Sequence, residues 1–200
     1  MIFCRSQRAA ERVRESITKF IEVKLHLCVN KEKTVVSYVR GVKYLGCSFY
    51  INKGKCLLTE HPKTKSKMRR RLKELTCRSN GMGYAKRKEK LRLYIKGWVN
   101  YCHLATMKRL TKETDEWLRR RLRMCIWKSW KLPKIRIKNL IKCGINKYNV
   151  HRWGYVKGYW RVAGTPIMQI AASNVMLRRA GYTFLNDEYV IWLPELRLLG

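Results

Sequence analysis

Closely spaced cations interleaved with tryptophans are the residues in this sequence that point most clearly to a chemistry. Arginines occupy positions 69–71 and return at 119–121 and 123, while Trp127 and Trp130 alternate with lysines just beyond them. Guanidinium and ammonium groups hold phosphates, and aromatic rings stack on bases. The pattern therefore indicates a surface that binds a nucleic acid.

The positive charge is concentrated in one part of the chain. The 200 residues carry a formal net charge of +33, and residues 61–142 hold 27 Lys and Arg against 5 Asp and Glu. Residues 1–60 hold only 12 against 5. So dense a positive charge repels itself unless a polyanion neutralises it, which again favours a nucleic-acid partner.

The acidic residues do not form a pattern that predicts catalysis. Asp115 and Asp187 are the two aspartates of the chain, whereas metal-dependent phosphoryl transfer needs clustered carboxylates. Each is followed by a glutamate, but adjacent residues of a helix point apart. Both aspartates are therefore expected to be ordinary surface acids, and the residues by themselves predict no catalytic group.

The eight cysteines are expected to be reduced and mostly buried thiols of a cytosolic protein. They have no C-x-x-C spacing, and a chain of this length does not depend on disulfides for its stability. A metal site is a less favoured alternative, built on Cys102 with His103 or on His26 with Cys28, because neither pair has zinc-module spacing. We therefore expect neither a metal ion nor a cofactor.

A membrane span is not expected, because the sequence has no run of 18 apolar residues. The apolar start Met1–Cys4 is interrupted at once by Arg5, so it does not predict a signal peptide. A basic helix lying on an anionic membrane surface is an open alternative. A cytoplasmic location without a membrane partner is preferred.

The periodicity of apolar residues predicts an α+β protein with a boundary near His61-Pro62. Residues 1–60 are expected to form a small antiparallel sheet with one helix, and the rest to be mainly α-helical. The predicted strands are 1–4, 25–29, 34–38, 43–51 and 55–59, the last two joined by a turn at Asn52-Lys53-Gly54. The predicted helices are 6–23, 64–77, 84–103, 111–130, 135–143 and one from Thr165-Pro166 to Gly181. Trp98 and Trp117 face the core of this arrangement, and the tail from Tyr182 is expected to pack back.

Several segments in order carry a resemblance to a protein family. They are Met1–Ser6, Arg8–Val13, Leu25–Thr34, Val42–Phe49, Leu93–Tyr101, Trp117–Lys131, Gly158–Arg161, Ala172–Leu177 and Gly181-Tyr182. In this order they resemble the C-terminal part of bacterial group II intron-encoded reverse transcriptase/maturases. The resemblance implies an incomplete palm remnant in residues 1–60, followed by a thumb and a maturase-specific domain in 61–200.

The resemblance also implies which parts of the family are missing. The Tyr-x-Asp-Asp catalytic turn would precede the first strand, so no polymerase activity of the chain alone is expected. The DNA-binding and His-Asn-His endonuclease modules of some members are expected to be absent as well. Lys33 resembles the palm lysine near the incoming nucleotide, and Gly46 a residue of the turn that positions the primer. Mg²⁺ is implied only for a complete polymerase or for the RNA.

What the resemblance implies for function is binding of group II intron RNA and assistance in its folding and splicing. The implied RNA-binding side chains are Arg69, Arg70, Arg71, Arg119, Arg120, Arg123, Trp127, Lys128, Trp130, Lys131, Lys134 and Arg136. The expected setting is the bacterial cytoplasm, with RNA and the nucleoid, and no protein partner is evident. Two alternatives stay open: a piece of an RNA-directed DNA polymerase that works with an upstream reverse transcriptase fragment, and a structural basic RNA-binding protein.

Overall fold

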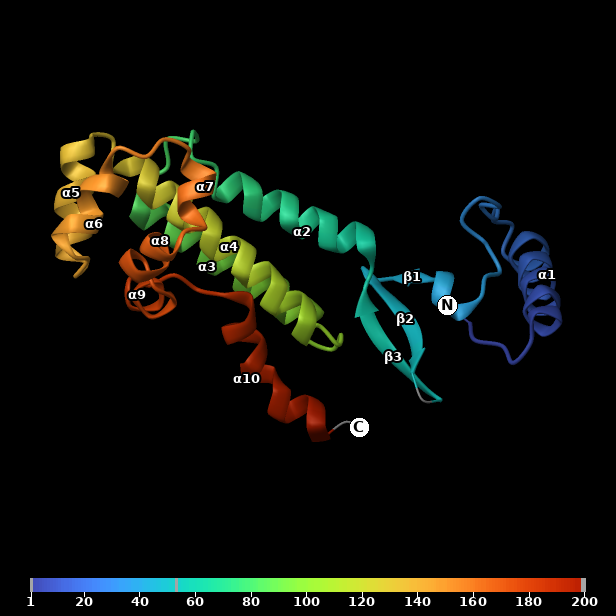
Figure 1. The fold of residues 1–200 in the computed structure, drawn as a ribbon. Coiled ribbons are helices and arrows are strands. Elements are labelled where there is room, and N and C mark those ends of the chain that lie inside the picture. The colour runs from blue at the N-terminus through green and yellow to red at the C-terminus, as the bar shows by residue number, and fades with distance from the viewer. Residues whose placement is uncertain (1, 53, 199–200) are drawn as a thin grey trace. The chain divides into compact units, whose positions relative to one another are not determined.

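The computed structural model describes residues 2–52 and 54–198 (Figure 1). The chain divides between His61 and Pro62 into two compact units. The first contains a three-stranded antiparallel sheet and one long helix, and the second is helical. The predicted α+β fold class with a mainly helical C-terminal part is therefore confirmed. The palm and thumb identities of the units stay predictions.

The first unit consists of a helix and a meander. Helix α1 spans Gln7–Lys24, and the Ser6 hydroxyl caps it by accepting a hydrogen bond from the Ala9 N–H at 3.2 Å. After a 3₁₀ turn, η1, at Val39–Gly41, strands β1 (Lys43–Tyr44), β2 (Cys47–Asn52) and β3 (Lys55–Glu60) pair in the order β1-β2-β3. The predicted hairpin is present as β2 and β3, although Lys53 in its turn lies outside the described residues. The single strand predicted over residues 43–51 is divided into β1 and β2 by a turn at Leu45-Gly46.

The turn between β1 and β2 explains one glycine of the sequence. Leu45 and Gly46 both have positive φ, of 47° and 80°. Two-residue hairpin turns with positive φ at both positions match the right-handed twist of the strands, and glycine adopts this conformation without a Cβ clash. Gly46 is thus required by the backbone of the turn.

Three strands predicted for this unit are wrong. In the predicted strands 1–4, 25–29 and 34–38, the described residues are irregular and pair with no described strand, and Met1 lies outside the described residues. A strand needs a partner for its N–H and C=O groups, and β-branched or alternating residues cannot supply that partner. The segment 2–4 still lies against the sheet, since the Phe3 ring packs edge-on at 6.1 Å from Phe49.

Helix α1 does not bury its apolar face among the described residues. No residue of the helix is buried, and Ile17, Phe20 and Val23 are 37%, 55% and 69% exposed. The amphipathic pattern predicted the helix itself correctly, but the described residues cover its apolar face only in part, leaving Val13 and Ile21 half-buried.

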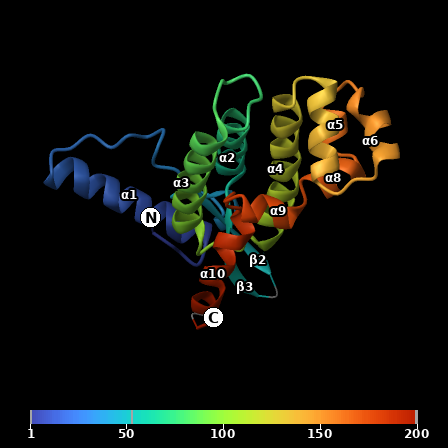
Figure 2. The same cartoon turned by 90° about the vertical axis from the view of Figure 1, so that its left-hand side faces the viewer.

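The second unit is built from nine described helices. They are α2 (Pro62–Leu75), α3 (Tyr84–Cys102), α4 (Lys108–Ser129), α5 (Pro133–Lys142), α6 (Lys147–Gly154), α7 (Tyr159–Ala163), α8 (Pro166–Ala171), α9 (Asn174–Arg179) and α10 (Leu185–Leu198). Helix α2 packs against α3 and α4, α10 also contacts both of these, and α5 packs against α6 (Figures 1 and 2).

The core of this unit follows the predicted helical periodicity. In α2, Met68, Leu72 and Leu75 recur at spacings of four and three residues and are buried. The same holds for the inward positions of α3 and α4, including Leu91 and Leu122. Burying such a side chain contributes about 1.5–3 kcal/mol. Trp98 and Trp117 are partly buried against this core, which confirms their predicted packing role.

The segment after Thr165 differs from its prediction. It forms two short helices, because the chain breaks at Ala172 and the Ser173 hydroxyl caps α9 by accepting from the Met176 N–H at 3.2 Å. Serine competes for local hydrogen bonds in this way and ends a continuous helix. Gly181, with φ of 87°, follows α9 as expected. The tail packs back as predicted, burying Phe184 among others.

The cysteine prediction was partly wrong. All eight cysteines are free thiols, but only Cys102 and Cys125 are buried, while Cys4, Cys28 and Cys56 are exposed. The exposed cysteines lie in the first unit, whose small sheet encloses few side chains.

Candidate nucleic-acid interface

The arginines of α4 are largely engaged within the second unit. Arg121 donates to the Thr76 hydroxyl at 2.6 Å and to the Lys73 carbonyl at 3.0 Å. The Arg120 guanidinium lies 4.2 Å from the centre of the Trp160 ring and donates to the carbonyl of that residue. Consecutive residues of a helix point in different directions, so the run 119–121 ties α4 to several segments.

Arg123 is buried and bridges α4 to the α8–α9 junction. Its guanidinium donates to the Ala172 carbonyl and to the Asn174 side-chain oxygen, both at 3.0 Å. The carbonyl of Ala172 lies where α8 ends, so the arginine satisfies an acceptor that the helix leaves unpaired. Burial lowers the pKa of Arg123 from its usual value, and two hydrogen bonds compensate for the lost hydration.

Arg136 and Trp127 form a second buried pair. Arg136 donates to the Trp130 carbonyl at 2.9 Å and to the Gly154 and Val156 carbonyls at 3.4 Å. Its guanidinium lies 4.8 Å from the centre of the Trp127 ring, which is 1% exposed. These side chains hold α5 against the end of α4 and the α6–α7 loop, so they face the interior.

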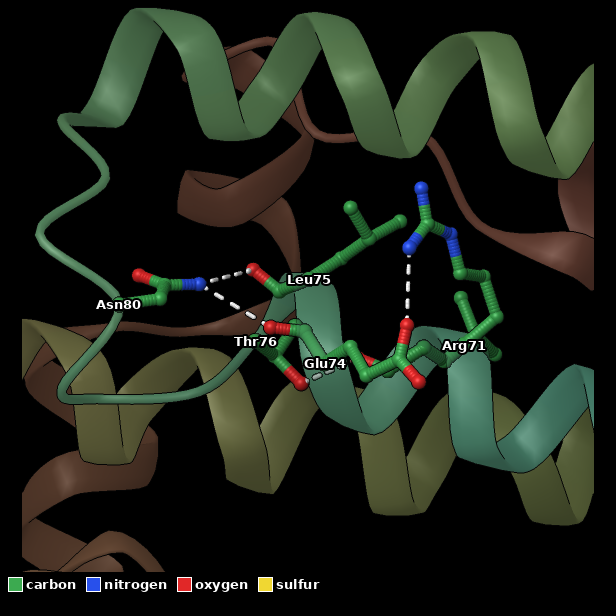
Figure 3. Close-up of polar contacts among 6 residues, drawn as sticks. Arg71, Glu74, Leu75, Thr76 and Asn80 are labelled. Atoms are coloured by element: carbon green, nitrogen blue, oxygen red, sulfur yellow. Dashed lines mark hydrogen bonds and ion pairs between the residues drawn. The ribbon is translucent and has the colours of Figure 1, made fainter.

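Other predicted RNA-binding side chains remain open to solvent. Arg69 and Arg70 on α2 are exposed, as are Lys131 and Lys134 around the start of α5. Arg71 is exposed but paired with Glu74 at 2.8 Å, and the Asn80 amide donates to the Glu74 carbonyl at the end of α2 (Figure 3). Of the rest, Arg119, Lys128 and Trp130 are half-buried. None of these placements tests RNA binding, so the site assignment stays a prediction.

Some exposed aromatic residues lie at positions for which the sequence predicted no RNA-binding role. Tyr148, Tyr155 and Trp160 are 85%, 65% and 40% exposed. Exposed lysines and arginines accompany them in the sequence, among them Lys147 and Arg161. The signal that could have found them is the same cation–aromatic alternation that marked residues 127–131.

In the first unit, the two positions carried over from the palm lie in turns. Lys33 is exposed, and its N–H donates to the side chain of Asn30 at 3.0 Å. Gly46 lies in the β1–β2 turn, and its carbonyl accepts from the His61 N–H at 3.0 Å. Neither contact tests the nucleotide or primer roles that the resemblance implies.

The two aspartates have structural partners, and the prediction that Asp115 is a surface acid was wrong. Asp115 is fully buried, and its carboxylate accepts hydrogen bonds from the N–H groups of Leu185 and Asn186 at 2.9 and 2.8 Å. Burial raises its pKa from 3.8 to about 6, more than these bonds lower it. Asp187 forms a two-bond ion pair with Arg178 at 2.7 and 2.8 Å.

Among residues 2–52 and 54–198, no group of three or more His, Cys, Asp or Glu side chains lies together as a metal ion would require. Within the same residues, no helix is long and apolar enough to cross a bilayer.

The N-terminal part of the second unit is similar to a known protein family. Residues 65–144, from α2 to the end of α5, match the model of the group II intron, maturase-specific domain. The resemblance predicted from the order of segments is thereby confirmed over residues 65–144, which are similar to a maturase-specific domain. A search of curated proteins finds no match.

Proposed function

We propose that the protein binds group II intron RNA and assists the folding and splicing of that RNA. The maturase-specific domain in residues 65–144 is the observation that carries the proposal. The positive charge of this region supports the proposal, because residues 61–142 contain 27 basic residues against 5 acidic ones. Folded RNA is recognised mainly through its backbone and shape, for which exposed cations are the matching chemistry.

The predicted RNA-binding side chains differ in how exposed they are and in whether protein groups already contact them. Arg123 and Arg136 are buried and donate hydrogen bonds to backbone carbonyls of the protein. Trp127 is buried against the Arg136 guanidinium. The better candidates are exposed cations such as Arg69, Arg70 and Lys134, which form no ion pair within 4.0 Å among the described residues, although Arg69 lies near Glu113. Long side chains of this kind reach phosphates at little cost to the fold.

Salt-dependent binding tests the proposal. Fluorescence anisotropy would compare intron RNA with duplex DNA of equal length over a range of KCl concentrations. We expect the protein to bind the RNA more tightly than the DNA. The slope of log Kd against log salt concentration should increase by about 0.7–0.9 for each phosphate that the protein neutralises. Equal affinity for the two nucleic acids at every salt concentration would contradict the proposal.

A matched pair of triple variants locates the binding surface. Arg69→Gln, Arg70→Gln and Lys134→Gln together remove three exposed charges from the maturase-specific domain, and we expect a weaker and less salt-dependent affinity. Arg8→Gln, Arg12→Gln and Lys19→Gln remove three exposed charges from α1. An equal loss in both variants would indicate a response to net charge alone.

A second candidate function rests on the exposed face of α1. The helix buries none of its apolar residues among those described, as expected for part of a palm completed by an upstream reverse transcriptase fragment. Such a pair would be an RNA-directed DNA polymerase. Primer extension after mixing the protein with that fragment tests this candidate, and no extension would remove it.

A further inference from the structure

A cavity of about 350 Å³ opens in the second unit between α3, α4, α8 and α9. Small-molecule sites in proteins occupy about 300–1,000 Å³, so the cavity is large enough for a compact ligand. The side chains that line it include Tyr84, Lys88, Met176, Leu177, Ala180 and Tyr182. None of them was predicted as a site residue.

The lining combines aromatic and apolar surface with one ammonium group. Lys88 donates one hydrogen bond to the Ala180 carbonyl at 2.9 Å, which leaves two of its three N–H donors for a ligand. No carboxylate lines the cavity among the described residues. The cavity therefore suits a flat, mostly apolar group that is attached to an anion.

The hydroxyl of Tyr182 is available to a ligand. The residue is 7% exposed, and its hydroxyl makes no hydrogen bond to any described residue. Burial raises its pKa to about 12, so the hydroxyl is protonated at neutral pH and remains both donor and acceptor. The hydroxyl is accessible from the cavity and is not sealed in the core, so it can donate to or accept from the hydrogen-bonding edge of a ligand.

The surroundings of the cavity add positive charge. Besides Lys88, the Arg87 guanidinium lies close enough to Tyr182 to act on its hydroxyl electrostatically, since burial raises the pKa of that hydroxyl and Arg87 lowers it. Arg178, by contrast, is neutralised by Asp187. An anionic ligand is thus favoured near Lys88 and Arg87.

We propose that this cavity binds the base of an unpaired RNA nucleotide, with the Tyr84 and Tyr182 rings against the base and Lys88 near its phosphate. The inference rests on the proposed function and adds to it a site for a base that has left the helical stack. Unpaired bases of folded RNA are bound in this way, by aromatic stacking and by hydrogen bonds to their edges. An apolar side chain of a partner protein would leave the Tyr182 hydroxyl unpaired, at a free-energy cost.

Two RNA duplexes that differ by one bulged nucleotide test the proposal with the full chain. At a fixed salt concentration we expect anisotropy to show about tenfold tighter binding of the bulged duplex, the order of effect of one stacked base. In the NMR spectrum, the Met176 methyl signal should shift with the bulged duplex and not with the paired one.

Variants at the cavity sharpen this test. Tyr182→Phe removes only the hydroxyl and should reduce the preference for the bulged duplex several-fold. Ala180→Phe fills the cavity from an exposed position and should abolish the preference, while the paired duplex binds as before. Ala85→Phe places an equal ring at an exposed position of α3 that does not line the cavity, and it should keep the preference. Thermal melts identify a variant that fails to fold.

The outcomes separate this inference from the proposed function. Salt-dependent binding of both duplexes with equal affinity, and an unchanged Met176 signal, would overturn the base site and leave RNA binding in place. Absence of binding to either duplex would overturn both. A Met176 shift produced by an amphipathic peptide but by neither RNA would overturn the base site in favour of a protein ligand.

Discussion

The Asp115 carboxylate accepts a hydrogen bond from the backbone N–H of Leu185 at 2.9 Å. It thereby caps α10 from α4, a helix 70 residues earlier in the chain, because the first N–H groups of a helix have no partner within it. The second oxygen accepts from Asn186 at 2.8 Å. A single side chain thus fixes where the tail begins its last helix.

Removing this cap should destabilise the second unit. Asp115→Ala leaves two N–H groups without their acceptors, and we expect a loss of about 2 kcal/mol in the free energy of unfolding. Asp115→Asn keeps one acceptor oxygen and should lose less. Urea denaturation followed by circular dichroism measures both. Glu113→Gln is the control on the same helix, where the partner Arg109 is 93% exposed, and it should change little.

The same carboxyl should make stability depend on pH. Its pKa is raised from 3.8 to about 6 in the folded state, so the folded protein binds a proton more tightly than the unfolded chain. The tighter proton binding contributes about 3 kcal/mol to the free energy of unfolding. This contribution is fully present below pH 4 and is lost as the pH rises through about 6. The difference in unfolding free energy between wild type and Asp115→Asn should therefore change over this range. A difference that is constant from pH 4 to 7 would contradict the assignment.

Arg123→Leu should lower stability more than RNA affinity. The substitution removes hydrogen bonds to Ala172 and Asn174 and leaves a helix-end carbonyl unpaired, at a cost of about 2–4 kcal/mol. Urea denaturation and RNA anisotropy of the same preparation give the two quantities. Arg120→Leu, with weaker bonds of 3.3–3.4 Å to Trp160, should cost less stability. Loss of RNA affinity at unchanged stability would instead support the RNA contact implied for Arg123 by the resemblance.

Hydrogen exchange should distinguish the two units. Helix α1 has no buried residue, whereas α3 and α4 bury Leu91, Ile95 and Leu122. Local opening costs least where few apolar contacts are lost, so the amides of α1 should exchange much faster than those of α3 and α4. Mass spectrometry of peptic fragments measures this, and equal protection would show that α1 is held by contacts that its exposure does not reveal.

The sequence alone predicted helices α1 to α5, the hairpin of β2 and β3 and the maturase-specific segment. The helices were predictable because Met68, Leu72 and Leu75 repeat with the period of a helix that has one buried face. The hairpin followed from two apolar runs joined by a glycine turn. Charge and order of segments then carried the resemblance that the family comparison confirmed over residues 65–144.

Only the tertiary structure decided what individual polar side chains do. Arg123, Arg136 and Asp115 look like surface charges in the sequence, yet all three are buried. Arg123 and Asp115 meet partners about 50 to 70 residues away, and no local pattern encodes such pairings. The cavity containing Tyr182 arises in the same way, from the meeting of four helices. Periodicity reports which face of a helix is apolar, whereas the role of a charge depends on the group that folding places beside it.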